Sequence, residues 1–222
     1  MAGTTDGCLA EDAASYLGGR SDAVQGLNGD TAEINRQSDL LIEWAIKNKA
    51  VLEESYFAGL RQLGNFTAEH EVFYRQSDNR AVKRTHGGCF GVTPQAKGLQ
   101  KAATPLFYLR RVQLMNRVFN SRIRLEGLAF TKSLLLGKTE GEHPCLVSSQ
   151  PWYIGLIPQE PHPTGDEIKQ FMNSLGFEER LGSYFGWVNR DQKISVIDAR
   201  RDNFIKTKEG AVPIDLVISE DS

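Results

Sequence analysis

Two short apolar runs near the end of the sequence, ISVID (residues 194–198) and AVPID (residues 211–215), restrict its fold more than any other feature. Each run is typical of a buried strand that ends in an aspartate, and the charged turn between them favours a hairpin. Asn203 follows Asp198 after four intervening residues, and a hairpin would bring Asn203 close to Asp215. Carboxylate and amide oxygens are ligands that Mg²⁺ accepts together with water and phosphate oxygens. The spacing therefore indicates a metal and phosphate site, although an aspartate at a strand end is also common as a turn cap.

The composition sets broad limits on the function. The 222 residues, 40% of them hydrophobic, are enough for one large or two small domains with a packed core. With 26 basic and 28 acidic residues the formal net charge is −2, so the chain lacks the positive field that non-specific nucleic-acid binding needs. Nucleic acid is therefore not an expected partner.

The cysteines and the absence of long apolar runs point to the cytoplasm. Cys8, Cys89 and Cys145 are far apart, and none has the spacing of a zinc site. The N-terminus shows no apolar core of a secretory leader, and no run approaches the roughly 18 apolar residues of a membrane span. We expect a cytoplasmic protein without membrane contact.

Hydrophobic periodicity and turn residues predict a mixed order of helices and strands. Residues 1–33 are rich in Gly, Ala, Asp and Thr and are expected to form a flexible N-terminal tail, with at most a short helix around LAEDAASYL. Thr164 is the expected cap of a helix that Gly176 ends. The further expected elements are helices over 38–49, 51–63, 104–119 and 163–177, strands over 122–132 and 144–152, and hairpins over 70–85 and 184–198.

A lysine upstream adds a cation suited to phosphate. Lys83 lies on the second arm of the expected 70–85 hairpin, before a long helix, where it can act as a point charge under the phosphates. Taken alone, Lys83 is more simply one of many surface lysines. The stretch SQPW then falls where the chain would pass between two lobes, so Gln150 and Trp152 are candidate neighbours of an adenine ring, or parts of a plain linker.

Six segments together resemble the polyvalent-protein kinases, which are compact kinase-like domains of bacterial and phage mobile elements. The segments are EHEVFY, AVKRTHGGCFG, RIRLEG, SSQPWYIG, PTGDEIKQFM and DARRDNF…PIDL. The similarity extends over roughly residues 38–218. It implies that Lys83 contacts the ATP phosphates, that Asp198 is the catalytic acid/base, and that Asn203 and Asp215 bind Mg²⁺. Arg200 falls where serine/threonine kinases keep a lysine that faces the γ-phosphate.

The resemblance implies an α+β, protein-kinase-like fold of two lobes. The expected N-lobe is small and built on an antiparallel sheet, and the expected C-lobe is truncated and minimal. After the tail, we expect N-terminal helices and the N-lobe over 34–148, and the C-lobe with its catalytic and metal loops over 149–222.

The sequence departs from the kinase pattern at several places. No glycine-rich phosphate loop precedes the 70–85 hairpin, where only Gly64 and NFTAEH stand, and Ile197 replaces the usual His-Arg before Asp198. Seven residues follow Asp215, so neither an activation segment nor a helical substrate lobe is expected. The helix after Lys83 contains no glutamate to pair with it. The alternative acids are Glu53, Glu54, Glu69, Glu71 and Glu126.

The leading hypothesis is an ATP- and Mg²⁺-dependent phosphotransferase that acts on a hydroxyl acceptor, either a protein or a small molecule. A second protein could complete the substrate surface. The alternative is a pseudokinase, a module that binds a nucleotide or a partner without turnover. A metal-dependent nuclease built on Asp198 and Asp215 is a third hypothesis, which the neutral charge disfavours.

Overall fold

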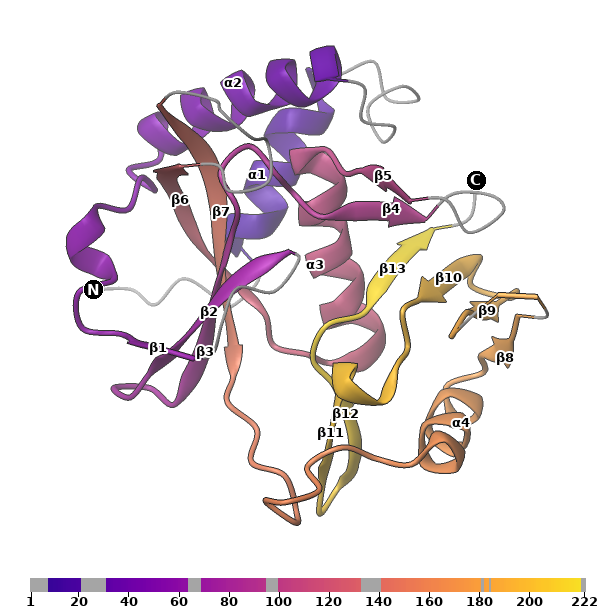
Figure 1. The fold of residues 1–222 in the computed structure, drawn as a ribbon. Coiled ribbons are helices and arrows are strands. Elements are labelled where there is room, and N and C mark those ends of the chain that lie inside the picture. The colour runs from indigo at the N-terminus through magenta and orange to yellow at the C-terminus, as the bar shows by residue number, and fades with distance from the viewer. Residues whose placement is uncertain are drawn as a thin grey trace. The chain divides into compact units, whose positions relative to one another are not determined.

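The computed structural model describes residues 8–20, 31–63, 69–94, 100–132, 141–180, 182–183 and 185–220. The chain divides into two compact units (Figure 1). The first comprises the chain up to Thr93, with 100–113 and 122–152, and the second comprises 94–99, 114–121 and 153–222. Both helices and antiparallel sheets are present, so the expected α+β class is confirmed. Gly64 and most of NFTAEH lie outside the described residues.

The first unit is built on a five-stranded antiparallel sheet (Figure 1). The order across the sheet is β1-β2-β3-β7-β6. The expected 70–85 hairpin is formed by β2 and β3, whose register pairs Arg75 with Arg80 across a turn in which Asn79 has φ of 54°. Asparagine tolerates this left-handed conformation better than most residues. The strands are β1 (Arg61–Gln62), β2 (His70–Arg75), β3 (Arg80–Thr85), β6 (Arg124–Lys132) and β7 (Glu142–Pro151).

The two faces of this sheet differ in chemistry. One face contributes Phe73, Val82 and Val147 to a buried apolar cluster that Phe57 completes from the chain before β1. Because side chains alternate along a strand, Lys83 lies on the opposite face, next to Ser148 in the register of β3 and β7. The α3 helix (Pro105–Phe119) packs on the face of Lys83 and Ser148. A separate two-stranded sheet pairs β4 (Val92–Pro94) with β5 (Gln100–Ala102).

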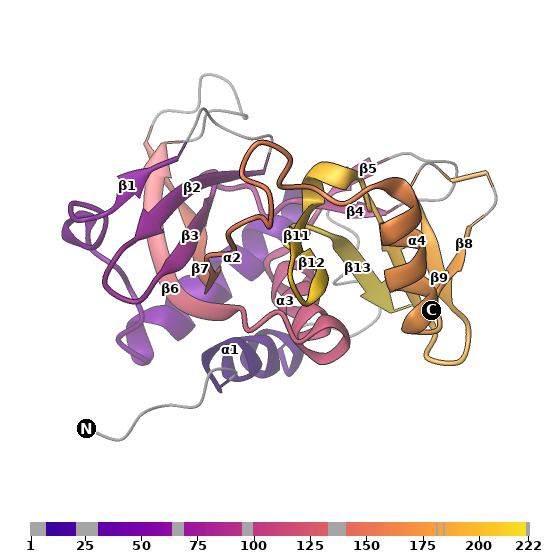
Figure 2. The same cartoon turned by 90° about the horizontal axis from the view of Figure 1, so that it is seen from below.

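Two helices precede the sheet, α1 (Cys8–Gly18) and α2 (Thr31–Lys47). Leu17 of α1 and Leu41 of α2 are fully buried, and Trp44 Nε1 donates to Asp12 Oδ2 at 2.8 Å. Figure 2 shows α1 alongside α3, where Gln113 Nε2 donates to the carbonyl of Ala10 at 3.5 Å. The segment expected to be a flexible tail therefore includes a helix with a buried face.

Residues 51–63, expected to be helical, form an isolated bridge, a 3-10 helix with a turn, and a two-residue strand. Val51 forms a parallel bridge to Leu128 of β6, followed by the 3-10 helix η1 (Glu54–Tyr56) and then β1. The amide of Leu128 donates to the carbonyl of Ala50 at 2.9 Å. Gly127 between them allows this approach, since a Cβ there would meet the Ala50 oxygen at 2.2 Å. Pairing with β6 has overridden the helical preference of the segment.

The second unit contains α4 (Gly165–Ser174), a four-stranded sheet and a hairpin. The sheet order is β13-β10-β9-β8, and its neighbouring strands are antiparallel. The strands of this sheet are β8 (Glu178–Glu179), β9 (Trp187–Asn189), β10 (Ile194–Ile197) and β13 (Val217–Glu220). The hairpin joins β11 (Phe204–Thr207) to β12 (Gly210–Pro213), and the 3-10 helix η3 (Arg201–Asn203) precedes it.

The α4 helix begins and ends as its sequence predicts. Thr164 Oγ1 accepts from the amide of Glu167, whose carboxylate accepts from the amide of Thr164 in return, which completes a capping box. Gly176 has φ of 77° just beyond the helix, a conformation that glycine adopts without strain. Ile168 and Met172 face the core.

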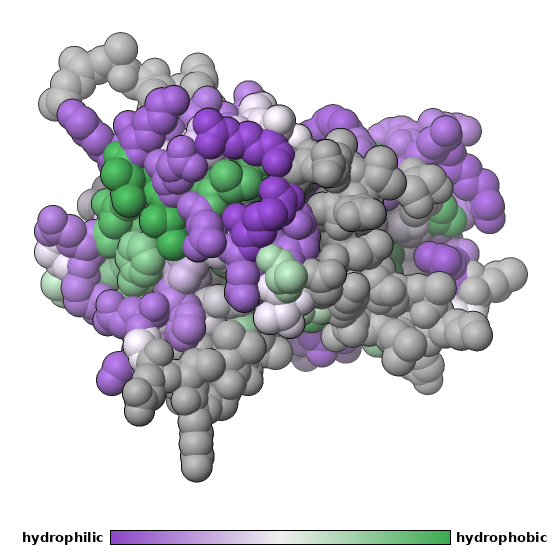
Figure 3. Space-filling view, turned by 90° about the horizontal axis from the view of Figure 1, so that it is seen from above, coloured by the Kyte–Doolittle hydropathy of each residue, from purple (hydrophilic) through white to green (hydrophobic). Residues whose placement is uncertain are grey.

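The described residues on the face drawn in Figure 3 are largely hydrophilic. In the view from above, purple residues surround a smaller green apolar area (Figure 3). Among the described residues, no helix combines the length and apolarity needed to cross a membrane.

Candidate active site

Asp198 and Asn203 are joined by two hydrogen bonds at the end of β10. Asn203 Nδ2 donates to the backbone carbonyl of Asp198 at 2.7 Å and to Asp198 Oδ2 at 2.9 Å. Asp198 has φ of 59°, which turns the chain sharply out of the strand and is better tolerated by aspartate than by bulky residues. Because both acceptors are oxygens that cannot donate, they fix the amide orientation of Asn203. Its other end, Oδ1, is therefore an oxygen ligand suited to a cation.

Arg200 holds the second oxygen of the Asp198 carboxylate. Arg200 Nε donates to Asp198 Oδ1 at 2.7 Å, and its guanidinium lies 3.5 Å from Asp202. The Arg200 side chain is 47% exposed, so its ion pair is open to water and readily exchanged for another anion. Both oxygens of Asp198 have partners in this arrangement.

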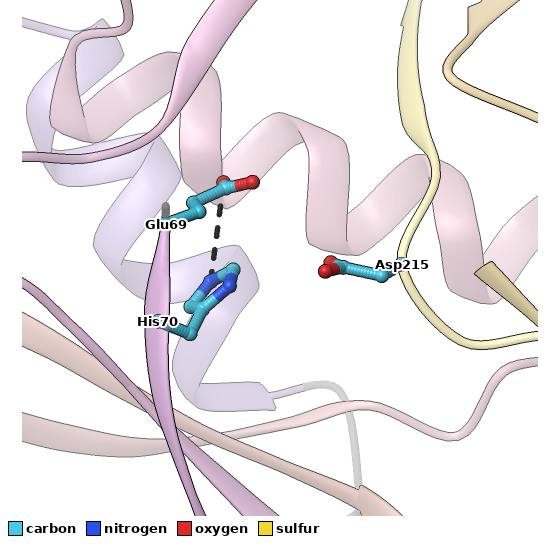
Figure 4. Close-up of side chains that lie close together, drawn as sticks. All are labelled: Glu69, His70 and Asp215. Atoms are coloured by element: carbon cyan, nitrogen blue, oxygen red, sulfur yellow. Dashed lines mark ion pairs between the residues drawn. The ribbon is translucent and has the colours of Figure 1, made fainter. Parts of the chain in front are cut away.

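Asp215 lies on the loop that leads into β13 (Figure 4). The β11–β12 hairpin pairs Phe204 with Pro213, and the amide of Ile214 then donates to the carbonyl of Asn203 at 2.9 Å. Beyond the loop, Val217 pairs with Ile197. The expected hairpin between residues 194–198 and 211–215 is wrong, because β10 pairs with β9 and β13 whereas β12 pairs with β11. The β11–β12 hairpin and the sheet still run the backbone beside Asp215 past the segment that holds Asp198 and Asn203.

Lys83 lies on β3 of the first unit. Its neighbours in the sheet register are Val72 on β2 and Ser148 on β7. Ser148 Oγ is 3.1 Å from the hydroxyl of Tyr108, which is 3.2 Å from His70 Nε2. These three polar side chains are buried, so the face of the sheet that carries Lys83 is lined by a connected polar chain.

Glu69, one of the acids considered for Lys83, is held by α3. It accepts a charged hydrogen bond from Arg111, and its carboxylate lies 3.9 Å from His70 Nε2 (Figure 4). Gly91 has φ of 85°, and a Cβ there would meet Glu69 Oε1 at 2.1 Å. The carboxylate of Glu69 is therefore confined between Arg111 and the Gly91 backbone.

The acids Glu71 and Glu126 also have strong partners. Glu71 pairs with Arg84 at 2.5 Å. Glu126 pairs with Arg75 at 2.9 Å. Burial alone would raise the pKa of Glu126, but hydrogen bonds from Arg75 and Ser149 outweigh it and lower the pKa. The pair with Arg75 thus favours the ionised carboxylate of Glu126, and the pair with Arg84 joins Glu71 to the neighbouring strand of the sheet.

Among the remaining acids, Glu54 is 85% exposed and lies 4.0 Å from Arg84, and Glu53 accepts a long 3.5 Å hydrogen bond from Ser55.

The sequence analysis did not identify Tyr108 and Arg111, two residues of α3 that contact His70 and Glu69. Their separation of three residues places them on one helix face, which is the only signal that could have indicated them.

Gln150 and Trp152 lie at the end of the last segment of the first unit. Gln150 pairs with Ala81 within β7 and is 5% exposed. The amide of Trp152 donates to the carbonyl of Asn79 at 3.0 Å, and its ring packs edge-on against Tyr74. The SQPW stretch is thus the end of a strand rather than a linker, and the chain leaves the first unit after Trp152.

Residues 35–220 match the family described as Serine/Threonine/Tyrosine Kinase found in polyvalent proteins, and the chain belongs to this family. Family membership supports a kinase-like phosphotransferase in general terms, with nucleotide and acceptor binding. No curated protein and no solved structure matches the chain.

Proposed function

We propose that the protein is an ATP- and Mg²⁺-dependent phosphotransferase with the two-lobe arrangement of a protein kinase. The observation that carries the proposal is the double hydrogen bond from Asn203 to Asp198, because it orients a carboxylate and an amide oxygen side by side. Such an arrangement suits phosphoryl transfer, which depends on positioning and electrostatic stabilisation more than on covalent chemistry.

The oxygens of Asn203 and Asp215 are the ligands proposed for Mg²⁺. Asn203 Oδ1 is directed away from the two acceptors that fix the amide, and the Ile214 hydrogen bond runs the Asp215 backbone past Asn203. Both groups offer the hard oxygen ligands that Mg²⁺ takes. When bound, the ion would neutralise charge on the phosphate oxygens.

Asp198 would orient the acceptor hydroxyl and take its proton. In the transfer, the hydroxyl oxygen forms a bond to the γ-phosphorus while the bond from that phosphorus to the β,γ-bridging oxygen breaks, which releases ADP. Asp198 Oδ1 becomes available when Arg200 exchanges its carboxylate partner for the phosphate, an exchange that its 47% exposure permits. Lys83 would supply a second cation from the sheet of the first unit, and Gln150 and Trp152 would lie near the adenine.

A pair of aspartate variants tests the proposal. Asp198→Asn removes the proton acceptor, and a general base contributes about a hundredfold to ten-thousandfold in rate. Asp202→Asn is the matched control, since Asp202 is 58% exposed and lies in the same loop. We expect transfer of labelled phosphate from ATP to fall at least hundredfold in Asp198→Asn and to persist in Asp202→Asn. Equal transfer by wild type and Asp198→Asn would contradict the assignment.

A pseudokinase is the second candidate, and one observation favours it. Both oxygens of Asp198 have partners, Arg200 and Asn203, so an acceptor hydroxyl would have to compete with them for the carboxylate. Stabilisation of the protein by ATP that requires Mg²⁺, without phosphate transfer, would support a binding role. A melting-temperature titration with ATP, with and without Mg²⁺, separates this candidate from the phosphotransferase.

A further inference from the structure

The second unit contains a cavity of about 620 Å³ beside the residues that follow Asp198. It lies between α4, the loop before β9 and the chain after β10. Its walls include Ile168, Lys169, Phe185, Trp187, Ala199 and Arg201. Ala199 and Arg201 are one and three positions after Asp198, so the cavity adjoins the proposed catalytic loop.

Phe185 is presented at this cavity by an unusual backbone. Its φ is 56° and its side chain is 48% exposed. The left-handed conformation is rare for a bulky residue and costs on the order of 1 kcal/mol or more. The carbonyl of Phe185 accepts from the amide of Ala199 at 3.1 Å. The exposed ring is thus tied by a backbone hydrogen bond to the residue next to Asp198.

The loop that carries Phe185 is closed by its own contacts. The amide of Arg180 donates to the carbonyl of Gly186 at 2.9 Å, and the amide of Ser183 donates to the carbonyl of Arg180 at 3.2 Å. A Cβ on Gly186 would meet Ser183 Oγ at 2.3 Å, so the loop requires glycine there. The backbone at Phe185 is therefore held by contacts within its own loop.

The exposure of the cavity walls indicates the kind of ligand. Ile168, Trp187 and Ala199 are buried at its base, whereas Lys169 and Phe185 at its rim are exposed. A site usually encloses roughly 70–90% of the surface of a small ligand. A cavity with an exposed rim does not enclose a ligand to this extent. An extended chain can cross such a groove and continue on both sides.

We infer that this cavity binds the acceptor as a peptide segment, in which a large apolar side chain next to the hydroxyl residue packs against Phe185. The inference rests on the proposed function, since it takes Asp198 as the group that receives the hydroxyl. Trp187 and Ile168 form the apolar base, and Phe185 selects the neighbouring residue of the peptide. The phosphoryl step is the one already given, with the hydroxyl proton passing to Asp198.

Binding of defined peptides tests the inference without requiring turnover. Short alanine-based peptides carry one serine, threonine or tyrosine, with Ala, Leu or Phe beside it, and their binding is measured by fluorescence anisotropy. Wild type is expected to bind the Leu or Phe peptides about tenfold more tightly than the Ala peptides, because burying an apolar side chain gains an amount of that order. Phe185→Ala should lose this preference.

Two further variants serve as controls. Phe185→Tyr keeps the ring and should keep the preference, whereas Ile154→Ala removes another exposed apolar side chain of the same unit, 71% exposed, and should change nothing. Absence of a preference in wild type, or a preference that survives in Phe185→Ala, would overturn the inference. So would N-acetylated amides of single amino acids that bind as tightly as the peptides.

The same peptides separate this inference from the proposed function. A Phe185-dependent preference without any phosphate transfer from ATP leaves the peptide site standing and removes the phosphotransferase. Transfer that depends on Asp198 but ignores the neighbouring residue leaves the phosphotransferase standing and removes the peptide site.

Discussion

Replacing Asn203 with alanine perturbs the second unit at one point, and its cost can be worked out from two contacts. The change removes the hydrogen bonds from Nδ2 to the carbonyl of Asp198 at 2.7 Å and to its carboxylate at 2.9 Å. A hydrogen bond to a charged group contributes about 1.5–3 kcal/mol, and a neutral one about 0.5–1.5 kcal/mol. The Asp198 side chain is 36% exposed, so water compensates in part. We expect a loss of about 2 kcal/mol in the free energy of opening this region.

Amide hydrogen exchange read by mass spectrometry measures this loss locally. A loss of about 2 kcal/mol corresponds to exchange roughly 30-fold faster in β10 and η3, whereas the sheet of the first unit should keep its protection. In the same variant, stabilisation of the protein by ATP should lose its dependence on Mg²⁺, because Oδ1 is removed as well.

Asn189→Ala is a matched control. Asn189 is also buried, at 4% exposure, donates from Nδ2 to the carbonyl of Leu175 at 3.1 Å and accepts from the amide of Gln192 at 3.0 Å. Its removal should raise exchange by a comparable factor but leave the effect of Mg²⁺ intact. Exchange in Asn203→Ala that rises less than about threefold, or a Mg²⁺ effect lost equally in Asn189→Ala, would refute the reasoning.

Asn203→Asp sharpens the test through its pH dependence. The new carboxylate would stand where Nδ2 lies, 2.9 Å from Asp198 Oδ2, and two carboxylates at that distance raise the pKa of one of them in the folded state. The destabilisation is then fully present above the raised folded-state pKa and disappears as the pH falls toward the unfolded-state pKa of about 4. We expect this variant, unlike Asn203→Ala, to recover stability as the pH falls from neutral toward about 4.

Three further outcomes follow from charged and buried groups. The hydrogen bond from Lys206 lowers the pKa of Glu167 to about 2. The contribution of Glu167 to the stability of α4 is therefore present above its unfolded pKa of about 4.3 and is lost as the pH falls toward 2. Glu167→Gln should abolish this pH dependence of amide exchange in α4. Burial raises the pKa of Cys145 to about 12, so a thiol reagent at neutral pH should label it only in urea, as peptide mass spectrometry can detect. Arg75→Ala leaves the carboxylate of Glu126 half-buried without its main partner and should cost about 3 kcal/mol in urea denaturation, most of which the double variant with Glu126→Leu should restore.

The parts of the fold that the sequence predicts are those with local signals. The capping box at Thr164 and the turn of the β2–β3 hairpin depend on residues within a few positions. In contrast, the true start of α2 is hidden because its first turns bury polar rather than apolar side chains. Gln37 is fully buried, and its Oε1 accepts from the amide of Leu106 at 3.0 Å. A partner 69 residues away leaves no trace in a local hydrophobic pattern.

The candidate site shows the same division. Asp198, Asn203 and Asp215 could be proposed as site residues from the sequence, because the prediction uses only residue type and spacing. Phe185 could not be identified from the sequence, because a single aromatic residue in a loop has no periodic pattern. Its conformation depends on the hydrogen bond from the amide of Ala199 to its carbonyl. The positions of such residues are determined by contacts between segments that are distant in the sequence, which residue spacing does not indicate.

The β11–β12 hairpin explains why the spacing between Asn203 and Asp215 matters less than their register. Its pairs run from Phe204 with Pro213 to Thr207 with Gly210, and the Ile214 amide extends the ladder to the carbonyl of Asn203. A shift of one residue within either arm would therefore bring a residue other than Ile214 to the carbonyl of Asn203. Added residues in the exposed turn beyond Thr207 would leave the ladder unchanged. The position of the Ile214 backbone beside Asn203 is therefore a property of strand pairing, and the number of residues between Asn203 and Ile214 is free to vary wherever the ladder is kept.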